Sequence, residues 1–282
     1  MARKHQAKIT VAAAGICLSV LLAGVTALGQ ERPPSDAPPA MPAPFSRDCR
    51  VPNDAVIAES PLPNVAAALQ KRKVIRILAI GASAITGRRG AYTEEIAKIL
   101  EQAVKGLDVV VINRGVSGEL ATDAEERIKI EVALTEPDLV LWQVGTNDAL
   151  AYVPIDELRD TIVQTIRWLK DHKVDVVLVG LQFVHRKAQD DNYRTVRELI
   201  RSIGQQENVV VVRRSEAMRL ITQAAGSGGG LFPEEFARTE AGYACLAEYV
   251  ARAIAVGAFG RSLRDQPRPG RVPGQPAPAP RQ

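Results

Sequence analysis

Short apolar runs alternate along most of the chain with longer segments in which apolar residues recur every three or four positions. The run at 138–144 has no polar interruption between Asp138 and Gln143, which is typical of a central strand buried on both faces. The runs that predict strands are residues 74–80, 108–112, 138–144, 174–181 and 209–212.

Helical periodicity fills the segments between these strands. Residues 92–104, for example, place Ile96, Ile99, Leu100 and Ala103 on one face. The remaining predicted helices are residues 121–134, 156–169, 193–203, 215–225 and 239–255. This strand–helix alternation predicts a parallel sheet with helices on both faces, which binds ligands beyond the carboxyl ends of its strands.

The first 29 residues have the pattern of a signal peptide. Arg3, Lys4 and Lys8 precede an apolar run at 9–29, and small residues at Ala27 and Gly29 suit cleavage before residue 30. We therefore expect an exported protein, periplasmic or secreted. The alternative is an uncleaved membrane anchor formed by residues 9–29.

Proline-rich segments flank the predicted domain on both sides. Residues 30–48 are expected to be a linker and residues 264–282 a disordered Pro/Arg-rich tail, which leaves one domain at 49–263. The signal segment and the tail each hold three positive charges net, so a total of +4 leaves about −2 for the remainder, the linker and the domain together. This balance argues against a nucleic-acid-binding protein.

Cys49 and Cys245 are the cysteines that follow the signal segment, whereas Cys17 lies inside its apolar run. Two cysteines in an oxidising compartment predict a disulfide, with two buried thiols as the alternative. The bridge would tie the first segment of the domain to its last helix.

Polar and glycine-rich turns follow the first three strands, at 81–87, 113–119 and 145–148. They offer the hydroxyl of Ser83, the backbone amide of Gly118 and the side-chain amide of Asn147. Because the carboxyl ends of parallel strands meet at one edge, we expect these groups to converge. A nucleophile facing two donors for a developing oxyanion is what acyl transfer requires.

In these three blocks the chain resembles the SGNH (GDSL-type) hydrolase superfamily, and the likeness extends over residues 74–256. The resemblance implies a three-layer α/β/α sandwich around a five-stranded parallel sheet of flavodoxin-like order. It makes Ser83 the nucleophile position and assigns Gly118 and Asn147 to the oxyanion hole. Ala82 replaces an aspartate whose role in the superfamily is structural.

The fourth block departs from the superfamily pattern Asp-x-x-His. The histidine position falls on Ala237 and the aspartate position on Glu234. Since serine needs a base, His185 after the fourth strand could substitute, or it could contact substrate or water instead. Glu234 or Glu235 could also serve, whereas His172 is expected on the surface.

Two interpretations follow from these blocks. The first is an exported serine hydrolase, an esterase or deacetylase acting on small-molecule or glycan esters, monomeric and without a cofactor or metal. The second is an inactive domain of the same fold that binds a cell-envelope glycan or a partner. An α/β domain unrelated to hydrolysis is the third alternative. A membrane contact is expected only through an uncleaved N-terminal segment.

Overall fold

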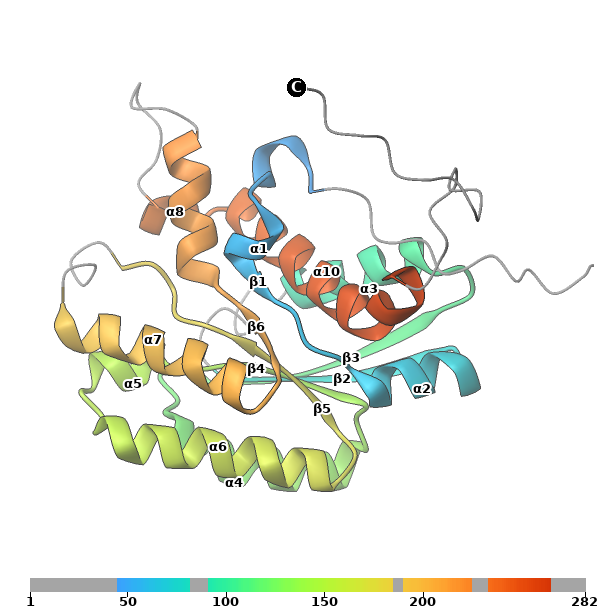
Figure 1. The fold of residues 1–282 in the computed structure, drawn as a ribbon, viewed down its shortest axis with the longest axis horizontal. Coiled ribbons are helices and arrows are strands. Elements are labelled where there is room, and N and C mark those ends of the chain that lie inside the picture. The colour runs from blue at the N-terminus through green and yellow to red at the C-terminus, as the bar shows by residue number, and fades with distance from the viewer. Residues whose placement is uncertain (1–44, 82–90, 185–189, 225–232, 265–282) are drawn as a thin grey trace, which may run out of the picture. The chain divides into compact units, whose positions relative to one another are not determined.

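A six-stranded sheet covered by helices on both faces makes up the domain (Figure 1). The computed structural model describes residues 45–81, 91–184, 190–224 and 233–264. The predicted signal peptide, most of the predicted linker and nearly all of the predicted tail lie outside these ranges. None of the helices in the described ranges is both long enough and apolar enough to cross a membrane.

The sheet has the order β1-β6-β5-β4-β2-β3. Five strands pair in parallel, and β1 pairs antiparallel with β6 at one edge. The parallel part therefore has the flavodoxin-like order that the resemblance implied. The strands are β1 (Ile57–Ala58), β2 (Val74–Gly81), β3 (Asp108–Gly115), β4 (Leu139–Gln143), β5 (Asp175–Val179) and β6 (Val210–Val212).

Helices form two layers on this sheet. One layer contains α4 (Ala121–Thr135), α5 (Thr146–Leu150), α6 (Ile155–Asp171) and α7 (Asp191–Gln206) (Figure 1). The other layer contains η1 (Arg47–Cys49), α1 (Asn53–Val56), α2 (Pro63–Lys71), α3 (Ala91–Ala103), α8 (Arg214–Ala224), α9 (Pro233–Phe236) and α10 (Glu240–Arg264).

The two faces of the sheet supply separate hydrophobic cores. Along β2, Ile77 and Ala79 enter the core beneath α3 and α10, whereas Leu78 and Ile80 enter the core beneath α4 and α6. This alternation follows from the period of two in a strand. Trp142 of β4 is fully buried in the second core.

The structure confirms the five predicted strands and six predicted helices to within a few residues at most ends, but it adds elements that the pattern missed. Strand β1 has only two residues, too few to show a period, and its edge is extended by the Arg213 N–H, which donates to Val56 O at 2.7 Å. Helix α2 begins with Pro63, and Asp175 of β5 accepts the N–H groups of Asn64 and Val65. That capping carboxylate lies more than one hundred residues away in sequence.

The chain entering the domain is fastened to α10. Cys49 and Cys245 form the predicted disulfide, with their Cα atoms 5.1 Å apart. The Tyr249 hydroxyl donates to Cys49 O at 2.7 Å, and the rings of Phe45 and Tyr249 meet edge to face. These contacts bind the first described segment to the last helix.

Replacing both Cys49 and Cys245 with alanine should lower the free energy of unfolding by about 2–4 kcal/mol, because the open chain gains conformational entropy when unfolded. Urea denaturation would measure the change. Wild-type protein unfolded under reducing conditions is the control and should match the double variant. Equal stability of the oxidised wild type and the double variant would contradict this role.

Candidate active site

The candidate site begins at Gly81, the last residue of the central strand β2. In the register of the sheet, Gly81 lies between Gly115 of β3 and Gln143 of β4. Its φ is +110°, and a Cβ here would lie 2.1 Å from Gln143 O, so only glycine fits. The predicted nucleophile Ser83 follows two residues later but lies outside the described residues.

The second turn is held against this strand end by backbone hydrogen bonds. The Val116 N–H donates to Gly81 O at 3.0 Å, and the Gly115 N–H donates to Asn113 Oδ1 at 3.0 Å. Gly118 then has a φ of +83°, and no atom lies within 4 Å of the position that a Cβ would take. The backbone of the predicted oxyanion residue is thus uncovered by other described residues.

Asn147 in the first turn of α5 meets the second turn directly. Its Nδ2 donates to Glu119 O at 2.9 Å, next to Gly118 in sequence. Since a side-chain amide nitrogen carries two hydrogens, one remains available for a ligand. A small pocket of about 10 Å³, room for a single water molecule, is lined by Gly81, Glu119, Asn147 and their neighbours. Gly118 and Asn147, predicted from separate turns, therefore lie beside the same strand end.

Asp148 holds the two turns in this arrangement. Its side chain is buried, with Oδ1 accepting the Ala121 N–H at 2.8 Å and Oδ2 accepting the Gly145 N–H at 3.0 Å. Burial raises the pKa of the Asp148 carboxyl, while the hydrogen bonds from Ala121 and Gly145 act in the opposite direction. The carboxylate thus joins the start of α4 to the start of α5.

Glu119 adds a second anchor that the sequence analysis missed. Its side chain is only 2% exposed, and Oε1 lies 2.5 Å from Arg127 Nε of α4. Arg127 also donates to Arg114 O in the preceding turn. One carboxylate therefore stabilises the turn whose carbonyl receives the Asn147 amide.

The candidate bases are placed only in part. His185 lies outside the described residues, and so does the side chain of Glu234, whose backbone belongs to the short helix α9. Ala237, at the predicted histidine position, is 1% exposed and packs in the core with α10. Glu235 is exposed, and His172 is exposed at the end of α6, where it stacks on Trp168.

Two further features concern the rim of the sheet. Asp190 caps α7, with its side chain accepting the Tyr193 N–H at 3.0 Å. Arg214, directly after β6, is 1% exposed and was not singled out from the sequence.

In the described part of the chain, no group of three or more His, Cys, Asp or Glu residues could hold a metal ion.

The model of the non-GDSL lipase-like family matches residues 48–259. An arylesterase of Vibrio mimicus is 28% identical over 109 residues, which cover 38% of this chain and 54% of that protein. An acetylxylan esterase of Geobacillus stearothermophilus is 23% identical over 144 residues, covering 48% of this chain and 64% of that protein. The chain thus spans less than two thirds of the length of either relative.

Solved structures share the fold. The structure of TesA superposes with a TM-score of 0.50 at 19% identity, covering 64% of this chain and 97% of TesA. The acetylxylan esterase Axe2 of Geobacillus stearothermophilus gives a TM-score of 0.52 at 23% identity, covering 64% of this chain and 94% of Axe2. At these identities the likeness bears on the fold alone, and it agrees with the predicted sandwich.

Replacing Asp148 with alanine should lower the free energy of unfolding by about 2–4 kcal/mol, because two buried N–H groups lose their acceptor. Asp148→Asn keeps one acceptor oxygen and should cost less. Chemical denaturation would measure both variants, with exposed Asp123→Ala on α4 as the matched control. An Asp148→Ala variant as stable as Asp123→Ala would show that the carboxylate does not join the turns.

Proposed function

The chain belongs to the non-GDSL lipase-like family within the SGNH hydrolase superfamily, and we propose that it hydrolyses carboxylic esters with Ser83 as nucleophile. The observation that carries this proposal is the hydrogen bond from Asn147 Nδ2 to Glu119 O. It places a side-chain amide beside Gly118, at the strand end that leads into Ser83. Under this proposal, Gly118 N–H and Asn147 Nδ2 are the two oxyanion donors.

In the proposed mechanism, Ser83 Oγ attacks the ester carbonyl carbon while a base removes the hydroxyl proton. The carbonyl oxygen becomes an oxyanion that accepts hydrogen bonds from Gly118 N–H and Asn147 Nδ2. Collapse of this intermediate breaks the ester C–O bond, and the alcohol leaves with the proton. Water then attacks the acyl-enzyme in the same way and releases the acid and free Ser83. The base is His185 or Glu234.

The proposed substrates are esters with a short acyl group on a small molecule or a glycan. Support comes from the two relatives, which are named as an arylesterase and an acetylxylan esterase. The signal-like segment at 1–29 adds the proposal that hydrolysis takes place outside the cytoplasm.

Ser83→Ala should abolish both ester hydrolysis and labelling by a fluorophosphonate probe, because the probe reacts only with an activated serine. The comparison uses purified protein, a labelling gel and release of 4-nitrophenol from 4-nitrophenyl acetate. A circular dichroism spectrum of each variant controls for folding. Hydrolysis that survives in folded Ser83→Ala protein would exclude the proposed nucleophile.

A second function, binding without catalysis, is favoured by the burial of Ala237. A serine hydrolase of this superfamily would be expected to carry its histidine there, yet the alanine is 1% exposed and packed in the core. Without a base, the oxyanion donors and the pocket alone would support only a residual rate, about 10³–10⁴-fold above water. The domain would then bind a cell-envelope glycan or a partner protein.

The double variant Glu234→Asp, Ala237→His separates the two functions. If the domain is a decayed esterase, restoring the pair should create or raise ester hydrolysis, although the larger side chain should cost about 1–3 kcal/mol of stability. Glu234→Asp alone is the control for the carboxylate change. A folded double variant with no gain in rate would indicate that the crevice no longer aligns a histidine with Ser83.

A further inference from the structure

Arg214 is a buried cation without an anionic partner in the described part of the chain. It is 1% exposed, and its Nε and Nη1 nitrogens have no hydrogen-bond partner there. Burial lowers the pKa of its guanidinium, while the hydroxyl groups of Tyr243, Tyr92 and Tyr193 act in the opposite direction. Arginine nevertheless stays protonated in proteins, so its positive charge has no compensating carboxylate among the described side chains.

Among the described residues, the side chains that interact with the guanidinium are tyrosines. Tyr243 is its hydrogen-bond partner, and Tyr92 has a fully buried hydroxyl with no partner in the described ranges. Together, the Tyr92 hydroxyl and the two nitrogens of Arg214 leave several buried donors unsatisfied. Buried donors of this kind are costly unless an acceptor joins them.

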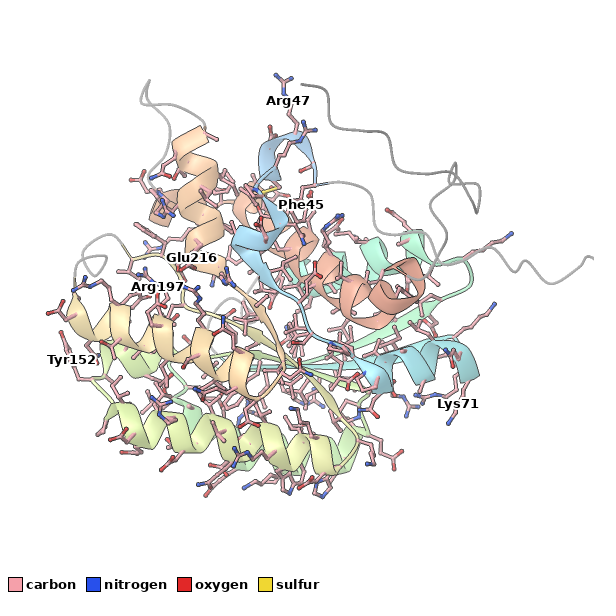
Figure 2. The ribbon with its side chains drawn as sticks, viewed as in Figure 1. Phe45, Arg47, Lys71, Tyr152, Arg197 and Glu216 are labelled. Atoms are coloured by element: carbon pink, nitrogen blue, oxygen red, sulfur yellow. A yellow bond between two sulfur atoms is a disulfide. The ribbon has the colours of Figure 1, made fainter. Side chains whose placement is uncertain are left out.

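The nearest acidic residue in sequence is engaged elsewhere. Glu216, two positions after Arg214 on α8, forms an ion pair with Arg197 of α7, with Oε1 and Nε 3.4 Å apart. Figure 2 shows these two side chains facing each other between α7 and α8. Glu216 Oε2 also accepts the Ser215 hydroxyl at 2.8 Å. The carboxylate of α8 therefore leaves the charge on Arg214 unpaired.

The cluster lies at the end of the sheet where this fold binds ligands. Arg214 follows the carboxyl end of β6, and Tyr92, Tyr193 and Tyr243 lie in the first turns of α3, α7 and α10. Two of these helices directly follow the segments that contain Ser83 and His185, and the third follows Ala237 closely. The cation is thus placed on the side of the sheet from which a substrate reaches the serine position.

The charge of the neighbouring sequence points the same way. The segments 82–90, 185–189 and 225–232 contain Arg88, Arg89, Arg186 and Lys187 and no aspartate or glutamate. This excess contrasts with the domain as a whole, whose net charge is −1. Positive charge in the sequence next to the helix starts that hold Tyr92 and Tyr193 favours an anionic ligand.

We propose that Arg214, with the Tyr92 and Tyr243 hydroxyls, binds a carboxylate, and that the enzyme therefore prefers esters carrying one negative charge. The preference for anionic esters rests on the proposed esterase function, whereas the binding of a carboxylate does not. A carboxylate is the appropriate anion because one negative charge balances one buried guanidinium, whereas a phosphate dianion would leave an excess. The carboxylate comes from the substrate or from the acid that hydrolysis releases.

Carboxylate binding is tested by comparing thermal unfolding in sodium acetate with thermal unfolding in sodium chloride of equal ionic strength. Acetate should raise the midpoint of the wild type, because a ligand that binds only the folded state stabilises it. Arg214→Met should lose this increase and should have a higher midpoint than wild type without acetate, because it removes an unpaired buried charge. Arg213→Met is the matched control and should keep the increase.

Arg213 differs from its neighbour in having backbone carbonyl partners: its Nη1 donates to Asp54 O at 3.1 Å and to Ala55 O at 3.5 Å, although its Nε has no partner among the described residues. Removing it should therefore lower stability. If Arg214→Met also lowers the midpoint in chloride, the charge is already balanced within the chain and the proposal is wrong. If Glu234→Gln raises the affinity for acetate, the chain's own glutamate occupies the site, which also overturns a substrate carboxylate.

The substrate preference is tested with 4-acetoxybenzoate and 4-acetoxybenzamide, two acetyl esters of similar shape that differ by one negative charge. Wild type should favour the anionic ester, and Arg214→Met should reduce the ratio of the two kcat/KM values about 10- to 100-fold. Arg214→Lys should restore part of the ratio, and Arg213→Met should leave it unchanged. A wild type with no preference for the anionic ester overturns the substrate assignment.

The two proposals fail in different ways. If neither ester is hydrolysed in a Ser83-dependent manner but acetate still stabilises only proteins with Arg214, the esterase is excluded and the carboxylate site stands. If hydrolysis depends on Ser83 but acetate has no effect and charge confers no preference, the esterase stands and the carboxylate site is excluded.

Discussion

The register of β2 between β3 and β4 is the constraint from which the crevice is built. Gly81 aligns with Gly115 on one side and Gln143 on the other, so the three turns begin at one level of the sheet. No Cβ can be added at Gly81 without displacing the Gln143 carbonyl. The bonds that assemble the site, from Val116 to Gly81 and from Asn147 to Glu119, both depend on this alignment. A shift of one residue would reverse the faces of β2 and separate the oxyanion donors.

The parallel sheet could be predicted because its strands are buried on both faces and therefore appear as continuous apolar runs. Strand β1 and helix α2 could not, since each is fixed by a distant residue. The carboxylate of Asp175 caps α2, and the backbone of Arg213 extends the edge at β1. Local pattern carries no information about such partners. The disulfide between Cys49 and Cys245 was accessible because composition alone left one pair after the signal segment.

The site was predictable where backbone geometry demands a residue type and unpredictable where environment decides a role. Gly118 was identified from its turn, and Asn147 from its block after the third strand. Arg213 and Arg214 are identical in sequence terms, yet one donates to backbone carbonyls while the other is buried without an anionic partner in the described residues. The two arginines are distinguished by the packing of three helix starts around Arg214. Ser83 and His185 stay predictions.

The alanine at 237 and the cation at 214 bear on the same chemistry. A base must be unprotonated to accept the Ser83 proton, and a nearby positive charge favours a neutral imidazole or an ionised carboxylate. An Asp–His pair works in the opposite sense, because its carboxylate stabilises the imidazolium that forms, so Arg214 does not replace the missing aspartate. The same charge would also serve a domain that only binds, because it would attract an anionic polymer. Catalysis and binding thus share Arg214, and they are distinguished by whether Ser83 is activated.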